Sequence, residues 1–99
     1  MQTLWTWDGI FFGYRDGDDL WTHAGRHVGH FENEEIYSSG GRYLGEVMND
    51  RLITCISRKV LGSHRFDPQA DRIGIVPSTN LMGVIMYLGY EDFPRLEDF

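Results

Sequence analysis

Apolar residues recur at a spacing of sixteen positions through the first two thirds of the chain. Four successive stretches begin with Leu4, Leu20, Ile36 and Leu52, and they run LWTWDGIFFGYRDGDD, LWTHAGRHVGHFENEE, IYSSGGRYLGEVMNDR and LITCISRKVLGSHRFD. Each stretch alternates short groups of strand-forming residues with turn-forming residues, a pattern typical of β-hairpins. An α-helix would lose about 1 kcal/mol at each of the closely spaced glycines. The spacing therefore predicts four tandem antiparallel β-hairpins over residues 3–66.

Two positions of the stretch carry residues that suit tight turns. The sixth position holds Gly9, Gly25 and Gly41, and the fourteenth holds Gly17, Asn33 and Asn49. A glycine three residues after a Thr or Ser suits a type I turn closed by a left-handed residue, and the hydroxyl can bond back to the turn. Asparagine also tolerates the left-handed conformation. We expect one turn inside each hairpin and a second turn between hairpins.

Two further positions describe the core. The first and ninth positions are apolar and are predicted to face inward, and the ninth holds Phe12, Val28, Leu44 and Val60. The tenth holds Gly13, Gly29 and Gly45, which predicts a bulge or a close approach of two backbones. In the fourth stretch Ser57 and Leu61 replace two of the glycines, so we expect a distorted fourth hairpin with Gly62 supplying the bend.

The last third of the chain is predicted to continue as strands over residues 67–90. We expect a loop at Asp67–Asp71, a short strand at Arg72–Val76 that Pro77 stops, and a strand at Leu81–Leu88, the most apolar segment. An apolar run of that length is typical of a strand buried on both faces or covered by a partner. We expect it to plug or cross the hairpin assembly, or to pair with another subunit.

The same region predicts a partner and the position of the C-terminal residues. A homo-oligomer would form through Leu81, Met82, Val84, Ile85 and Met86. Residues 91–99 carry four acidic residues and one arginine, and they are predicted to form an acidic tail over the surface of a single domain spanning residues 1–99.

The runs LWTHAGRHVGHF and IYSSGGRYLGEV resemble the four-fold β-flower family of small bacterial proteins. The resemblance covers about residues 3–66. The aromatic–x–x–x–Gly–Arg pattern is also similar to the YD repeats of large bacterial surface and toxin proteins. The β-flower resemblance implies an all-β fold whose hairpins lie like petals about a pseudo-four-fold axis. It implies no known activity.

Aromatic residues provide the main functional hint. Those singled out are Trp5, Trp21 and Tyr37 at the second position, with Trp7, Tyr43 and His27 nearby. Rings on successive hairpins can bind a glycan, an amine or a Pro-rich peptide. The alternative, which we favour, is that the rings are packing residues. If Leu4 and Thr6 face inward, Trp5 and Trp7 face the other side, and both sides cannot be core unless something covers one of them.

The histidines form no metal or catalytic motif. His23 and His27 have the spacing of helical zinc ligands, but a predicted turn separates them. A hydrolase or nuclease using His27, His30 or His64 is the least favoured hypothesis, because no base, nucleophile and orienting group stand together. We predict no catalytic residues, no metal and no cofactor.

Charge and composition narrow the partners. The net charge of −6 argues against nucleic acid, because phosphate binding needs clustered Lys and Arg. Cys55 is the only cysteine, so no intrachain disulfide forms, and the longest apolar run is too short for a membrane helix. No signal peptide is evident, and we expect a cytoplasmic protein by default. The favoured function is a non-catalytic interaction or structural module, with small-ligand binding as the alternative.

Overall fold

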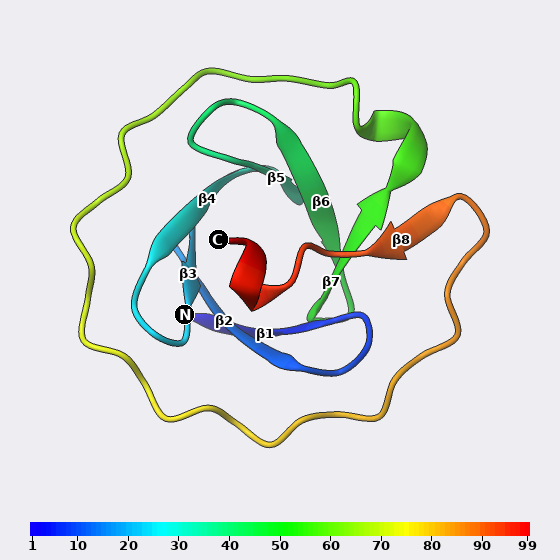
Figure 1. The fold of residues 1–99 in the computed structure, drawn as a ribbon, viewed down its shortest axis with the longest axis horizontal. Helices are drawn as coiled ribbons and strands as arrows, with labels where there is room; N and C mark the ends of the chain where they lie inside the picture. The colour runs from blue at the N-terminus through cyan, green and yellow to red at the C-terminus, as the bar shows by residue number, and fades with distance from the viewer.

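The computed structural model describes residues 1–99 and contains strands and two single-turn 3₁₀ helices. The strands are β1 (Gln2–Thr6), β2 (Phe11–Asp16), β3 (Asp19–Thr22), β4 (His27–Glu32), β5 (Glu35–Tyr37), β6 (Tyr43–Met48), β7 (Arg51–Cys55) and β8 (Tyr90–Asp92); the 3₁₀ helices are η1 (Ile56–Arg58) and η2 (Leu96–Asp98). Each strand pairs with the next, and β1 also pairs with β7, so the first seven strands close into a barrel (Figure 1). The all-β prediction is confirmed.

The closing pair of the barrel is parallel, whereas every other pair is antiparallel. In an up-and-down meander the odd-numbered strands all run the same way, so closing strand seven onto strand one gives a parallel pair. Trp5 lies beside Arg51 and Thr6 beside Leu52. The amide of Trp5 donates to the carbonyl of Asp50 at 3.0 Å.

The turns within β1–β2, β3–β4 and β5–β6 lie where the sequence predicts them. Their glycines, Gly9, Gly25 and Gly41, have φ of +93°, +96° and +83°. Each glycine amide donates to the carbonyl of the Thr or Ser three residues earlier, at 2.8–3.0 Å. The hydroxyl of that Thr or Ser accepts the amide of the residue after the glycine at 3.2 Å. The turns between hairpins are also confirmed, with positive φ at Gly17, Asn33 and Asn49.

The tenth-position glycines sit where backbones crowd together, as predicted. In all three hairpins the strand register shifts next to these glycines; in β1–β2, Leu4 faces Gly13 and Trp5 faces Phe11, so Phe12 is bulged. A Cβ on Gly45 would lie 2.5 Å from the carbonyl oxygen of Ile53 and 2.7 Å from the ring of Phe93. Glycine is needed here because any side chain would displace a strand or that ring.

The core lies inside the barrel and contains the four first-position residues, all of which are fully buried as predicted. The other buried members are Phe12, Phe31 and Phe93, with Val28 and Leu44 partly buried against them. Val60, the fourth ninth-position residue, is 89% exposed. The prediction that Val60 faces the core is therefore wrong.

The fourth hairpin does not form from residues 59–66, and this part of the prediction is wrong. After β7 the chain turns through η1, in which Ser57 stands where the other hairpins have a glycine with positive φ. Without that glycine the hairpin turn is not made, and the chain leaves the sheet. The antiparallel partner of β7 is β8, which returns from far along the chain to pair Ile53 with Asp92 and Cys55 with Tyr90.

Residues 63–89, here called the strap, run around the outside of the barrel (Figure 1, green through orange). The strap contains no strand or helix. Three of its amides, nine residues apart, donate to the hairpin-turn glycines. The pairs are Ser63 with Gly41, Arg72 with Gly25 and Leu81 with Gly9, at 2.7–2.8 Å. Further amides donate from Phe66 to Ser39, from Gln69 to His27 and from Ile75 to His23. From Ser63 to Ile75 the bonded amides thus fall three residues apart, the period of polyproline II, and Leu81 follows after six residues.

The strap corrects the predictions for the apolar C-terminal segments. Neither Arg72–Val76 nor Leu81–Leu88 is a strand, and Leu81–Leu88 is exposed rather than buried on both faces or threaded through the barrel. The reason is that the barrel interior is already filled. Side chains from β1–β7 occupy it, together with Phe93.

The plug of the barrel is instead residues 93–99, which were predicted to trail over the surface as an acidic tail. Phe93 packs edge-on against Phe12 at 5.4 Å between ring centroids, and Phe99 packs against both rings. Leu96 also contacts this cluster. The apolar residues recur every third position and point inward, while Glu97 and Asp98 stay exposed. The structure has no helix of the length and apolarity needed to cross a membrane.

The strap contacts predict a large difference between two glycine substitutions. A Cβ on Gly25 (φ +96°) would overlap the carbonyl of Arg72, whereas Gly89 (φ +85°) has open space around it. Gly89→Ala should lower the free energy of unfolding by about 1–2 kcal/mol, the cost of a left-handed alanine. Gly25→Ala should cost at least about 2 kcal/mol more, because the strap must also move. Urea unfolding of both variants measures this, and equal losses would show that the strap is not held at Gly25.

Candidate functional site

Five of the six predicted site residues belong to cross-strand pairs on the outer face of the hairpins, and the sixth, Trp7, packs against Tyr87 of the strap at 5.2 Å between ring centroids. Trp5 faces Phe11, Trp21 faces His27 and Tyr37 faces Tyr43 in the strand register. The ring centroids of these pairs are 5.5, 5.0 and 6.1 Å apart. Each pair combines the residue at the second position of a stretch with the residue at the eighth. The structure therefore brings the members together hairpin by hairpin, in three separate places.

The strap lies over the pairs of Trp5 and Trp21 and over Trp7, and it supplies them with polar partners. The indole Nε1 of Trp5 donates to the carbonyl of Thr79 at 3.0 Å, and that of Trp7 donates to the carbonyl of Ile85 at 3.2 Å. The guanidinium of Arg72 lies over the ring of Trp21, 3.8 Å from its centroid, and binds Asp16. The hydrogen bond to Asp16 raises the pKa of Arg72. The cation–π contact and these hydrogen bonds attach the strap to the aromatic outer face of the hairpins.

His27 is the most completely engaged of the predicted site residues. Its side chain is buried, with Trp21 stacked on one side and Phe66 of the strap at 5.0 Å. The amide of Gln69 donates to Nδ1 at 2.9 Å, so Nδ1 carries no proton. Nε2 therefore carries the proton, and it donates to Oδ1 of Asp19 at 2.9 Å. Asp19 in turn accepts from the side-chain amide of Gln69 at 3.0 Å.

A polar cluster surrounds the third aromatic pair. Glu46 is buried and its carboxylate binds the guanidinium of Arg58 at 2.5 Å. This carboxylate raises the pKa of Arg58. The hydroxyl of Tyr43 accepts the amide of Cys55 at 3.1 Å, and burial raises the pKa of Tyr43. A hydrogen bond with Ser57 lowers the pKa of the Cys55 thiol. The ion pair is buried on one side only, because the Arg58 side chain is 46% exposed, and the hydroxyl of Tyr43 lies 3.4 Å from the buried Glu46 carboxylate.

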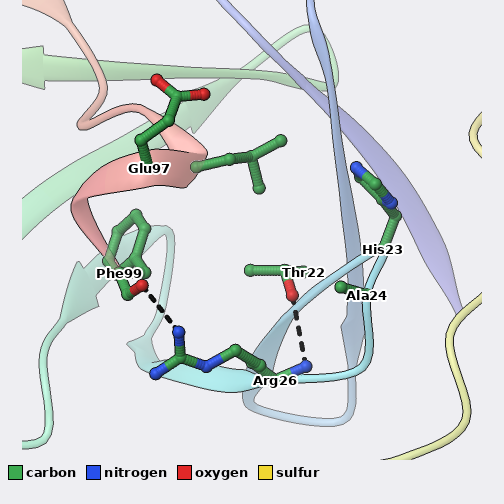
Figure 2. Close-up of a pocket in the computed structure, with 7 residues that line it drawn as sticks. Thr22, His23, Ala24, Arg26, Glu97 and Phe99 are labelled. Atoms are coloured by element: carbon green, nitrogen blue, oxygen red, sulfur yellow. Dashed lines mark hydrogen bonds between the residues drawn. The ribbon is translucent and has the colours of Figure 1, made fainter.

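Three cavities surround the plug, where it meets the hairpins. One of about 330 Å³ is lined by Thr22, His23, Arg26 and Phe99 (Figure 2). A second of about 640 Å³ lies between the plug, β6 and β7, and a third of about 150 Å³ lies near Asp8. Of the six predicted ligand-binding residues, only Tyr43 lines any of the three. This placement favours the packing interpretation of the aromatic residues over ligand binding.

Several residues that matter at this surface were not identified from the sequence. Gln69 and Arg72 hold the strap on the second hairpin, and Asp19 orients His27. Ser63, Arg72 and Leu81, whose amides reach the turn glycines, lie nine residues apart. This spacing is a weak sequence signal, because it is carried by main-chain amides and the three residues share no side-chain type.

The histidines do not assemble into a hydrolytic centre. Both ring nitrogens of His27 are taken by partners within the chain, and His30 lies 3.6 Å from the same Asp19 oxygen. His64 is exposed, and no group of His, Cys, Asp and Glu side chains is arranged to hold a metal ion. Comparisons with family models, curated proteins and solved structures find no match to the chain. Its function is therefore inferred from its own geometry.

The His27 contacts predict the effect of replacing its ring nitrogens. His27→Phe keeps a ring between Trp21 and Phe66 but leaves the Gln69 amide and the Asp19 carboxylate without this partner. We expect the free energy of unfolding to fall by about 1–3 kcal/mol. The matched control, His64→Phe at an exposed site, should change it by less than about 0.5 kcal/mol. Chemical denaturation measures both, and an unchanged His27→Phe stability would contradict the assigned bonds.

The raised tyrosine pKa values predict a loss of stability in alkali. Tyr43, Tyr37 and Tyr90 keep their protons in the native state above pH 10.0, the ordinary tyrosine pKa, because burial disfavours the phenolate. Unfolded tyrosines lose theirs, so the unfolded state releases protons and the free energy of unfolding falls as pH rises past about 10. In Tyr43→Phe the free energy of unfolding should fall less steeply with pH above about 10, and it should be lower at neutral pH.

The alkaline test uses unfolding curves between about pH 8 and pH 12. Both proteins should carry Cys55→Ala, because the lowered pKa of Cys55 acts with the opposite sign in the same range. A slope unchanged by Tyr43→Phe would mean that the Tyr43 hydroxyl is not buried as described.

Proposed function

We propose that the protein is a non-catalytic interaction module that self-associates through the second half of the strap, residues 82–89. The observation that carries this proposal is a row of eight successive main-chain N–H groups, 82 to 89, none of which donates a hydrogen bond within the chain. In the first half of the strap such donors recur every third residue. An extended segment with free amides is a template for strand addition.

The side chains of this segment support a second copy as the partner. Met82 and Ile85 are 86% and 88% exposed, and Leu88 is fully exposed. No charged residue occurs between Arg72 and Glu91, although 24% of the chain is charged and its net charge is −6. An uncharged apolar strip requires no charge complementarity, so two identical strips can pair across a two-fold axis. Pairing would hide apolar surface while the charged surfaces stay apart.

The expected complex is weak. A standard interface uses about 20–30 residues a side, and the strip offers the eight residues Leu81–Leu88 with a few apolar neighbours. A two-fold axis perpendicular to the strip places the second strip antiparallel to the first, so we expect antiparallel pairing. In this arrangement the contact set consists of Leu81, Met82, Val84, Ile85 and Met86.

In this proposal the barrel has the arrangement that the β-flower resemblance implies. Three hairpins, β1–β2, β3–β4 and β5–β6, and the pair β7–β8 serve as four petals about a pseudo-four-fold axis, with the strap joining their outer edges. Equivalent hydrogen bonds at residues sixteen apart, such as those of Gly9, Gly25 and Gly41, support a repeated unit. In this scheme the petals are scaffold and the strap is the working surface.

Sedimentation velocity over about 1 µM to 1 mM protein tests self-association. We expect the mass to rise from that of a monomer toward that of a dimer. Ile85→Lys should keep the protein monomeric, because a buried charge opposes its copy across the axis. Ile73→Lys is the matched control, since Ile73 is 94% exposed but lies in the bonded half of the strap. A wild-type monomer throughout the range, or equal effects of both variants, would overturn the proposal.

A further inference from the structure

The strap meets the three hairpins through contacts that repeat. The amides of Ser63, Arg72 and Leu81 donate to the sixth-position glycines of the third, second and first hairpin in turn. These amides are nine residues apart and the glycines are sixteen apart, so nine residues of the strap correspond to one hairpin. A contact that the strap makes with two hairpins therefore predicts where an equivalent contact should lie on the remaining one.

One such contact involves the amide three residues further along the strap. The amide of Phe66 donates to the carbonyl of Ser39 at 3.1 Å, and that of Ile75 donates to the carbonyl of His23 at 2.7 Å. Ser39 and His23 each occupy the fourth position of their stretch. On the second and third hairpins the fourth-position carbonyl therefore holds the strap.

The equivalent hydrogen bond is missing on the first hairpin. It would join the amide of Val84 to the carbonyl of Trp7, but that amide donates to no acceptor within the chain. The guanidinium of Arg51 donates to the Trp7 carbonyl instead, at 3.0 Å, and this carbonyl is the only partner of the guanidinium in the structure. A charged donor makes a stronger hydrogen bond than a main-chain amide does, so it has the advantage at a shared acceptor.

The main chain of the strap nevertheless lies in nearly the same place on the first hairpin as on the second. A Cβ built on Gly83 would be 3.4 Å from the carbonyl oxygen of Asp8, and the equivalent Cβ on Gly74 would be 3.3 Å from that of Ala24. The indole of Trp7 also donates to a strap carbonyl, at 3.2 Å. The strap is therefore held beside the acceptor that its amide does not reach.

Arg51 departs from the pattern of the stretches. It stands at the sixteenth position, where the other three stretches have the acidic residues Asp19, Glu35 and Asp67. A carboxylate cannot donate to a carbonyl, whereas a guanidinium can. The strap thus lacks its second hydrogen bond on the one hairpin whose fourth-position carbonyl meets a basic side chain.

We propose that Arg51 keeps the self-association strip open by competing with the Val84 amide for the carbonyl of Trp7. While the guanidinium occupies that carbonyl, the row of amides 82–89 is free for a second copy. Without the guanidinium, the carbonyl of Trp7, a residue that is 3% exposed, would lose its donor. A buried acceptor without a donor is unfavourable, so the Val84 amide would take its place and interrupt the row. The effect on self-association rests on the proposed function, whereas the competition does not.

Hydrogen exchange of the Val84 amide, followed by nuclear magnetic resonance on the full chain, tests the competition. Arg51→Met keeps an unbranched side chain but cannot donate, and Ile85→Lys as the common background keeps every protein monomeric. We expect Arg51→Met to slow exchange at Val84 about tenfold. Arg51→Lys retains a charged donor and should leave Val84 exchanging fast.

The matched control is Arg15→Met. The guanidinium of Arg15 also donates to main-chain carbonyls, those of Gly17 and Asn33, but these lie between hairpins and away from the strap. This variant should leave exchange at Val84 unchanged.

Protection of the Ile75 and Leu81 amides reports whether the strap and the barrel stay intact in each variant. Arg51→Ala, which also lacks a donor, gives the same test should Arg51→Met lose that protection. The competition is overturned if Val84 exchanges as fast without the guanidinium while Ile75 and Leu81 stay protected, or if Arg51→Lys slows Val84 as much as Arg51→Met does.

Sedimentation velocity without the Ile85→Lys background separates this inference from the proposed function. Arg51→Met alone should raise the dissociation constant of the dimer about fivefold, the equivalent of one hydrogen bond. An unchanged dimer together with a slowed Val84 amide would overturn the control of the strip by Arg51 and leave the proposed function standing. A wild-type monomer would overturn the proposed function and this control together, while the exchange rates would still decide the competition.

Discussion

The structure depends on main-chain hydrogen bonds between the strap and the hairpin turns. Each hairpin of a closed barrel has an inner face that fills the core and an outer face that must be covered or left in water. Here the outer faces of the hairpins carry aromatic pairs, and the strap lies across those of Trp5 and Trp21. It is fixed by amides that reach the glycine carbonyls of three turns. A chain of 99 residues thereby packs both faces of its hairpins.

The bonds between the strap and the barrel also explain which polar groups are engaged within the chain. The bonds that engage His27 and Arg72 run between strap and barrel, so these side chains are partners in assembly rather than free groups. The row of unengaged amides lies on the second half of the strap, where the main chain keeps hydrogen-bonding capacity for another molecule.

Local features of the fold could be predicted because each depends on one or two residues. Glycine and asparagine mark the reversals at Gly9 and Asn33, and the inward position of Leu4 follows from strand alternation. The path of residues 59–99 could not be predicted, because an apolar run such as Leu81–Leu88 has the same pattern whether it is buried or lies outside. Competition for the interior decides, and Phe93 occupies it. The aromatic column was predicted as a group, but its cover was not, since main-chain amides leave no side-chain signature.

Hydrogen exchange of the strap amides tests the central claim most directly. The account predicts slow exchange at Ser63, Phe66, Gln69, Arg72, Ile75 and Leu81, and fast exchange at the amides between them. Protection should therefore recur every third residue from Ser63 to Ile75 and again at Leu81. Uniformly fast exchange would contradict the account, because the strap would then be unattached. Protection at every second residue would contradict it equally, because the strap would then be a paired strand.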